Sequence, residues 1–123
     1  MMHKHTISFK HAFRGIKYAF MTQPNYRIHA ICSIFALGAG FFFNITKSEF
    51  LIIGLLVVMG FSIETINTAI EQTNDAITED KREAIRNAKD LSAGAMLIFA
   101  IGSVILASII FYPYLFAFIG AKR

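Results

Sequence analysis

The sequence lacks several features on which soluble nucleotide-binding or disulfide-stabilised proteins depend. It has a single cysteine, Cys32, which excludes an intrachain disulfide. Neither glycine-rich phosphate loop, GxxxxGK(S/T) or GxGxxG, occurs, so nucleotide binding through those loops is excluded. The four histidines do not have the spacing of a transition-metal site. Any nucleotide or metal chemistry must therefore use another architecture.

Charge is also scarce, and what replaces it is apolar. Only 16% of the 123 residues are charged, whereas 55% are hydrophobic, and the mean hydropathy is +0.54. A soluble domain could not cover its own surface with this balance, so we predict an all-α integral membrane protein. The long apolar stretches are residues 28–46, 50–63 and 91–120.

These stretches predict one membrane domain, 1–123, with three transmembrane helices at 27–45, 49–76 and 87–112. An amphipathic helix at 5–21 precedes them and is predicted to lie in the membrane interface. Its apolar stripe is Phe9, Phe13, Ile16 and Phe20, and its basic stripe is Lys10, Arg14 and Lys17. This helix is either a lipid anchor alone or also the roof of a site.

Lysine and arginine are distributed unequally between the two sides of the predicted spans. Nine lie before the first span or between the second and third, and Lys47, Lys122 and Arg123 lie on the other side. The positive-inside rule then places the N-terminus and the 76–90 loop in the cytoplasm, which predicts a multi-pass protein of the cytoplasmic (inner) membrane. The net charge of +4 suits contact with anionic lipid, and we expect no nucleic-acid partner.

The second predicted span runs directly into a polar stretch, ETINTAIEQTNDAI at residues 64–77. At about 100° per residue, one helix face carries four of its polar side chains, namely Glu64, Asn67, Glu71 and Asp75. Intramembrane carboxylates are costly and usually mark a functional site. The alternative is an idle polar clamp between helices, paired to Lys89 or Arg86. A stripe of four polar residues favours a functional site over a clamp, because a clamp needs only one partner.

The opposing wall is NAKDLSAGA, residues 87–95, at the start of the third span. Lys89 can bind phosphate as a point charge, and Asp90 can accept from a ribose hydroxyl or hold Lys89 in place. Taken singly, Lys89 could simply extend its ammonium group to the membrane interface. Asp90 could simply stabilise the N-terminus of the helix with its negative charge. Acids for a divalent metal, a base at membrane depth and a cytoplasmic cation together indicate phosphoryl transfer from a soluble nucleotide to a lipid.

These residues resemble the small prokaryotic membrane diacylglycerol kinase and undecaprenol kinase family, whose pattern is E-x-x-N-(S/T)-A-I-E-x-x-x-D followed by A-K-D. The resemblance extends over essentially the whole chain. It implies a homotrimer with composite active sites, in which ATP and Mg²⁺ serve phosphorylation of a lipid alcohol.

The resemblance also implies roles for single residues. Glu64 would be the general base on the lipid hydroxyl, Asn67 would position that site, and Glu71 would bind magnesium. Gln23 stands where the family has a second metal-binding glutamate, so one charge is missing from the metal site. The nucleotide contacts would be His11, Asp75, Asp80, Lys81, Arg82, Lys89 and Asp90.

The resemblance leaves two candidate lipids as the phosphate acceptor. The stretch PNYRIH, which includes His29, resembles the undecaprenol kinase branch, so undecaprenol is favoured and diacylglycerol is the alternative. Two other classes of function stay open: a structural subunit, and a proton or cation pathway. A pathway predicts carboxylates spread through the membrane depth, whereas all except Glu49 lie toward the predicted cytoplasmic end.

Overall fold

The computed structural model is all-helical over the residues that it describes, 2–77 and 82–121, with side chains described from residue 8 onward. The helices are α1 (Met2–Thr22), α2 (Pro24–Phe43), α3 (Lys47–Ile77) and α4 (Glu83–Gly120). The last three are each long and apolar enough to cross a membrane. The predicted all-α fold with three such helices is confirmed. The single domain 1–123, the interfacial placement of the N-terminal helix and the trimer stay predictions.

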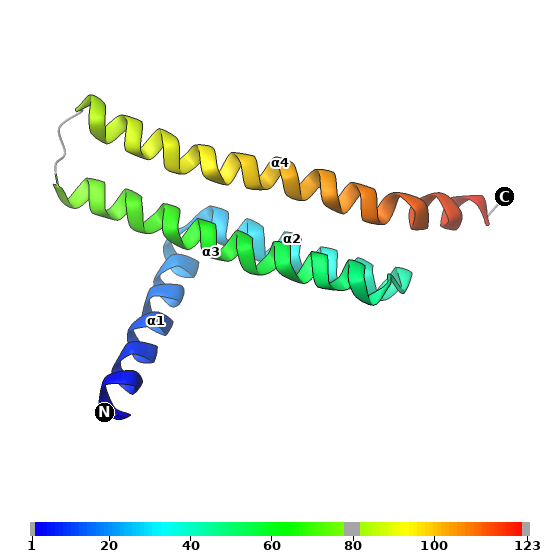
Figure 1. Cartoon of the computed structure of the whole chain (residues 1–123), viewed down its shortest axis with the longest axis horizontal. Helices are drawn as coiled ribbons and strands as arrows, with labels where there is room; N and C mark the ends of the chain where they lie inside the picture. The colour runs from blue at the N-terminus through cyan, green and yellow to red at the C-terminus, as the bar shows by residue number, and fades with distance from the viewer. Residues whose placement is uncertain (1, 78–81, 122–123) are drawn as a thin grey trace.

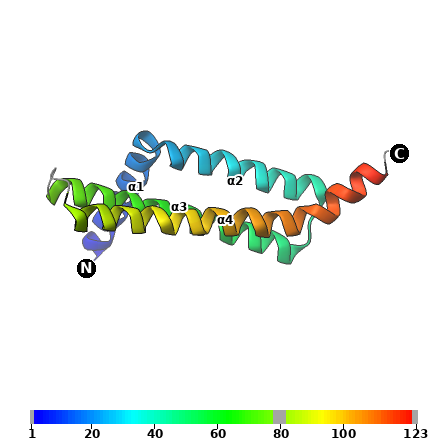
Figure 2. The same cartoon turned by 90° about the horizontal axis from the view of Figure 1, so that it is seen from above.

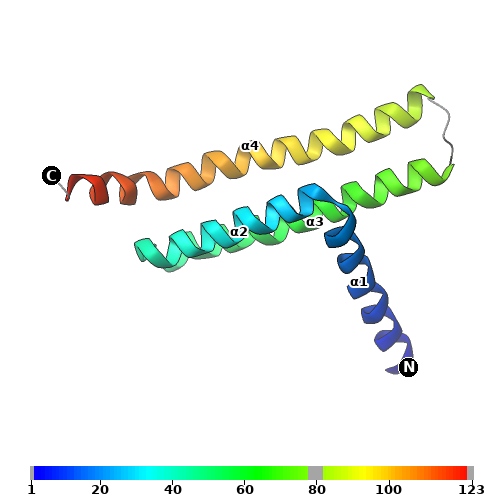
Figure 3. The same cartoon turned by 180° about the vertical axis from the view of Figure 1, so that it is seen from behind.

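Helices α2, α3 and α4 lie alongside one another, and α1 projects away from them (Figures 1 and 3). Helix α3 is central, because it packs against both α4 and α2. Helix α1 touches α2 and α3 only near its own C-terminus, where Ala19 is buried. The predicted apolar stripe of α1, from Phe9 to Phe20, is therefore exposed in the single chain.

The junction between α1 and α2 is sharp because of Gln23 and Pro24. Gln23 is extended, with φ −100° and ψ 114°, and Pro24 occupies the first turn of α2, where its missing N–H leaves nothing unpaired. Tyr26 then lies buried against Phe20 of α1 and Phe61 of α3, with ring centroids 6.2 and 4.9 Å away. This one side chain fixes the junction against the bundle.

The turn between α2 and α3, residues 44–46, is closed by its own side chains. Asn44 ends α2 in the left-handed region, at φ 51°. Thr46 and Glu49 form a capping box, since the Thr46 amide donates to Glu49 Oε2 at 2.7 Å and the Glu49 amide donates to Thr46 Oγ1 at 3.3 Å. Tyr114 of α4 also donates its hydroxyl to Glu49 Oε2, at 2.7 Å. Three elements therefore meet at one carboxylate.

The apolar core of the described residues lies at this same end. Ile45, Ile53 and Ile110 are buried together, one from the turn, one from α3 and one from α4. Gly40 of α2 permits the close approach, because a Cβ there would lie 3.0 Å from Ile45 and Phe50. Toward the other end of the bundle, α3 and α4 bury polar side chains.

Helix α4 is longer than the predicted span 87–112, because it continues through Pro113 to Gly120. The last turns of α4 bend toward the side on which α2 lies (Figure 2), as a proline in a helix would produce. Contacts beyond the proline support this extension. Phe118 packs on Phe43 of α2 at 6.0 Å, and Tyr114 is held by Glu49.

Candidate active site

The end of the bundle where α3 ends and α4 begins, here called the polar end, buries side chains that membrane helices usually avoid. Glu64 is the most enclosed, with 1% of its surface exposed. Asn67, Thr68 and Asn74 of α3 and Ser92 of α4 are buried with it. The polar stripe predicted on one face of α3 thus faces protein over Glu64 and Asn67, while Asp75 is exposed at its end.

A hydrogen-bond relay crosses from α4 to α3. Ser92 Oγ donates to Asn67 Oδ1 at 2.6 Å, and Asn67 Nδ2 donates to Glu71 Oε1 at 3.2 Å. Because an amide has one accepting and one donating end, these two bonds fix which end of Asn67 faces the carboxylate. Asn67 is therefore held in the orientation that stabilises Glu71.

Several buried polar atoms on α3 have no hydrogen-bond partner among the described residues. They are Glu64 Oε2, Thr68 Oγ1 and Asn74 Nδ2. A polar atom left buried and unpaired costs about 1–3 kcal/mol, so proteins rarely retain one without a use. Three such atoms on one helix, next to the relay, mark the place where a substrate or a second chain would supply partners.

Lys89 of α4 is held across the helix interface by Asp75 of α3, with Nζ 2.5 Å from Oδ1. Sequence reasoning gave this holding role to Asp90, which is adjacent in the chain. In the structure Asp75 holds Lys89 instead. The antiparallel packing of α3 and α4 brings these two residues together, whereas consecutive residues on one helix point in different directions. The polar clamp considered above is thus realised for Asp75. The pair is well exposed, so Lys89 could exchange this partner for a phosphate at small cost.

The other predicted nucleotide residues are placed less closely. His11 Nδ1 lies 2.9 Å from an Arg14 nitrogen on α1. Arg82 is the extended residue that precedes α4, and Asp90 is exposed on the first turns of that helix. Asp80 and Lys81 lie outside the described residues. Asp75 and Lys89 are joined, whereas no hydrogen bond among the described residues joins His11 to Lys89.

The predicted Mg²⁺ site can be compared with the carboxylates that the structure describes. Among the described residues no group of three or more His, Cys, Asp or Glu side chains could hold an ion. Glu71 is close enough to Glu64 for their carboxylates to interact electrostatically. Mg²⁺ typically takes one or two carboxylates and completes its shell with phosphate and water, so Glu71 could serve as one such ligand.

Gln23, the predicted second metal position, precedes α2, and its Nε2 lies 3.4 Å from Thr22 Oγ1. Its side chain is only partly exposed. No hydrogen bond between Gln23 and Glu71 is seen in the described part of the chain. A metal role for Gln23 therefore stays a prediction.

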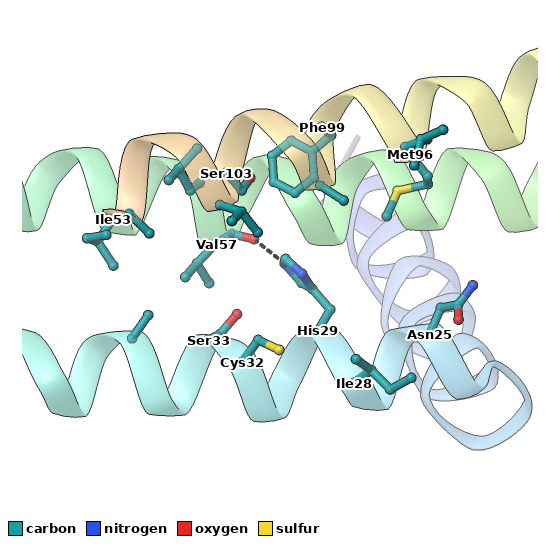
Figure 4. Close-up of a pocket in the computed structure, with 16 residues that line it drawn as sticks. Asn25, Ile28, His29, Cys32, Ser33, Ile53, Val57, Met96, Phe99 and Ser103 are labelled. Carbon is teal, nitrogen blue, oxygen red and sulfur yellow. Dashed lines mark hydrogen bonds between the residues drawn. The ribbon is translucent and has the colours of Figure 1, made fainter. Parts of the chain in front are cut away.

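An apolar cavity of about 550 Å³ opens between α2, α3 and α4, nearer the middle of the bundle (Figure 4). Its walls are mostly aliphatic, from Ile28, Ile53, Leu56, Val57, Leu97 and Val104. On α3 the cavity reaches Val57, which is two helical turns before Glu64 on the same face. On α4 it reaches Met96, one turn after Ser92. The cavity therefore lies in the apolar length of the bundle, about two helical turns from Glu64 along α3.

Comparison with known proteins agrees with this arrangement. The family model described as prokaryotic diacylglycerol kinase matches residues 10–111, which include the relay, Glu64 and the cavity. The chain belongs to the prokaryotic diacylglycerol kinase family. The family membership predicted from the sequence is thereby confirmed.

Several named proteins are similar in sequence to this chain. An undecaprenol kinase of Bacillus subtilis is 42% identical over 88% of this chain and 88% of its own length. A diacylglycerol kinase of Synechocystis is 32% identical over 87% of this chain, which spans 62% of that protein. A diacylglycerol kinase of Haemophilus influenzae is 26% identical over 85% of this chain and 90% of its own length.

Three residues near the candidate site were not predicted from the sequence as site residues. Ser92 was seen only as part of the 87–95 wall, although it lies three positions after Lys89 and so on a neighbouring face of the same helix. Asn74 lies beside Asn67 on the helical wheel and could have been added to the stripe by the same spacing rule. His29 lines the cavity, and it had been noted only for its resemblance to one branch.

Proposed function

We propose that this protein is an ATP-dependent lipid kinase that phosphorylates undecaprenol at the cytoplasmic face of the membrane. Membership of the family and the names of its relatives support the predicted lipid kinase function. The 42% identical relative named undecaprenol kinase favours undecaprenol as the acceptor. Diacylglycerol, which would yield phosphatidic acid, is the second candidate, because two relatives carry the name diacylglycerol kinase.

The observation that carries the proposal is the state of Glu64. Its carboxylate is almost fully buried, and Oε2 has no partner among the described residues. A structural carboxylate at this depth would be expected to accept hydrogen bonds or pair with a cation. An unpaired buried oxygen on the face of α3 that further along lines the apolar cavity instead fits a base that receives the proton of a hydroxyl group.

In the proposed reaction the lipid hydroxyl oxygen attacks the γ-phosphorus of ATP while its proton passes to Glu64 Oε2. The new O–P bond forms as the bond to the bridging oxygen of ADP breaks, and Glu64 later returns the proton to solvent. Asn67, fixed by Ser92, holds Glu71 in place. Glu71, with Glu64 nearby, would hold Mg²⁺, which neutralises charge on the nucleotide phosphates when bound. Lys89 would turn from Asp75 to a phosphate oxygen.

The apolar cavity supports a lipid acceptor with a single chain leading away from its hydroxyl. Its volume of about 550 Å³ lies within the range of about 300–1,000 Å³ that is usual for small-molecule sites. A long polyprenyl chain exceeds it, so only the first isoprene units would lie inside, and the rest would lie in the bilayer.

The proposal extends to the assembly and its placement. A homotrimer with shared sites is supported by the buried atoms that one chain leaves unpaired and by the large apolar side chains exposed along α2, α3 and α4. The exposed apolar stripe of α1 supports an interfacial helix. The charge distribution supports an inner-membrane protein whose N-terminus and 76–90 loop face the cytoplasm.

The test is transfer of the γ-phosphate from MgATP to undecaprenol and, separately, to diacylglycerol, with the purified protein in mixed micelles. We expect faster transfer to undecaprenol. Glu64→Gln should keep its fold and lose about 10²- to 10⁴-fold in turnover, as loss of a general base does. Glu49→Gln, at the opposite end of the bundle, is the matched control and should retain activity.

Each outcome separates the candidates. Normal turnover in Glu64→Gln would exclude the role of that carboxylate. Faster transfer to diacylglycerol would replace the proposed lipid by the second candidate. Absence of transfer to either lipid, with no binding of MgATP, would instead favour a structural subunit or an ion pathway, because neither of these needs a nucleotide.

A further inference from the structure

Three aromatic side chains from three helices meet at one glycine between the cavity and Glu64. The His29 ring of α2 lies edge-on to Phe61 of α3 at 4.6 Å and to Phe99 of α4 at 6.0 Å. A Cβ built on Gly60 would collide with both His29 and Phe99, so only glycine lets the rings close here. We call His29, Phe61 and Phe99 the aromatic collar.

The orientation of His29 is fixed by a hydrogen bond. Its Nε2 lies 3.2 Å from the Val57 carbonyl oxygen, and since that oxygen can only accept, Nε2 carries the proton and donates. Figure 4 shows the ring reaching from α2 toward Val57, on the same side of the cavity as Phe99. A ring held by one bond and two aromatic neighbours does not swing freely.

The position of the collar relative to the base is set by α3 itself. Gly60 precedes Glu64 by four residues, so the two positions lie about one helical turn, or roughly 6 Å, apart along the helix axis and on the same face. His29 and Phe99 also line the cavity. A lipid with its hydroxyl at Glu64 and its chain in the cavity must pass these two rings within its first few carbons.

We propose that the aromatic collar selects the acceptor lipid, because it favours a single chain that is planar next to the hydroxyl group. The inference rests on the proposed lipid kinase function and deepens it. In a polyprenol the carbons next to the hydroxyl form a planar allylic group, which can lie against an aromatic face. In diacylglycerol the neighbouring carbon already carries an ester branch, and two chains would have to pass. His29 is thus a specificity residue for allylic polyprenyl alcohols.

The experiment compares kcat/KM for three acceptors in mixed micelles: a polyprenol, the same polyprenol with its hydroxyl-bearing unit saturated, and diacylglycerol. His29→Ala removes the ring, and we expect the preference for polyprenol over each of the other lipids to fall by about tenfold. His29→Phe keeps a ring while losing the bond to Val57, so it should retain most of the preference. Phe50→Leu changes an aromatic at the far end of the bundle and should leave both ratios unchanged.

Gly60→Ala provides a second route to the same result, in case His29→Ala does not fold. Its added methyl group would push both rings aside, and the two preference ratios should again fall. Ratios that stay at the wild-type value in both His29→Ala and Gly60→Ala would overturn the collar. A wild-type protein that phosphorylates none of the three lipids would refute the proposed function itself, which is a distinguishable failure.

Discussion

The relay from Ser92 through Asn67 to Glu71 predicts a large effect for a small change at a residue that touches no reacting atom. In Ser92→Ala one hydroxyl is removed from a buried position, and Asn67 Oδ1 loses the donor that lies 2.6 Å away. The Asn67 amide then keeps only its bond to Glu71, in which Nδ2 donates to Oε1 at 3.2 Å. Its position is therefore less firmly fixed, and so is the carboxylate that it holds.

The magnitude follows from the burial of the acceptor. An acceptor left buried and unpaired costs about 1–3 kcal/mol, against about 0.5–1.5 kcal/mol for the net worth of an ordinary exposed bond. With tenfold in rate for each 1.36 kcal/mol, a loss of about 5- to 160-fold in kcat/KM is expected, because the less firmly held amide disturbs Glu71 throughout the reaction. The KM for MgATP should carry part of this loss, because Glu71 is the proposed metal ligand.

The assay is lipid phosphorylation at varied MgATP, with Ser108→Ala as the matched control. Ser108 lies on the same helix, and its hydroxyl donates only to the Val104 carbonyl one turn earlier, at 2.7 Å. Its loss should be nearly silent. Wild-type kinetics in Ser92→Ala would refute the relay. A double-mutant cycle with Asn67→Ala gives a second check, since effects that simply add would show that the two residues act independently.

Four further substitutions test other contacts. Gln23→Glu restores a carboxylate at the predicted second metal position and should lower the Mg²⁺ concentration for half-maximal activity; an unchanged titration would remove residue 23 from the metal site. Lys89→Ala should raise the KM for MgATP about tenfold or more by deleting a phosphate contact, whereas Asp75→Asn should leave thermal stability almost unchanged, because exposed ion pairs contribute about 0–1 kcal/mol. Tyr114→Phe removes the donor to Glu49 and should lower the unfolding temperature in detergent with kcat unaltered; a fall in kcat with normal stability would contradict this.

Periodicity was enough to predict the helices and the polar face of α3. The stripe from Glu64 to Asp75 follows from the angle between residues on one helix, which the structure merely realises. The motif around it also sufficed for the family, which the comparisons confirm. Both depend on information that is local in the chain.

Contacts between helices were not predictable in the same way. The pairing of Lys89 with Asp75 and of Ser92 with Asn67 depends on the register of α4 against α3, and no local pattern reports that register. The continuation of α4 through Pro113 depends likewise on contacts with Phe43 and Glu49. The collar required three helices to converge on Gly60, which appears in the sequence only as a glycine within an apolar run.

One end of the bundle contributes mainly to stability, and the other contains the residues of the proposed reaction. At the 44–46 turn, Glu49 accepts three hydrogen bonds on one oxygen, and Ile45, Ile53 and Ile110 form the buried apolar cluster at the same end. At the polar end, Glu64, Thr68 and Asn74 each bury a polar atom that has no partner among the described residues. Such a site destabilises a single chain, so it can persist only if firm packing elsewhere offsets its cost. Substitutions near Glu49 should therefore reduce stability first, and substitutions near Glu64 should reduce activity first.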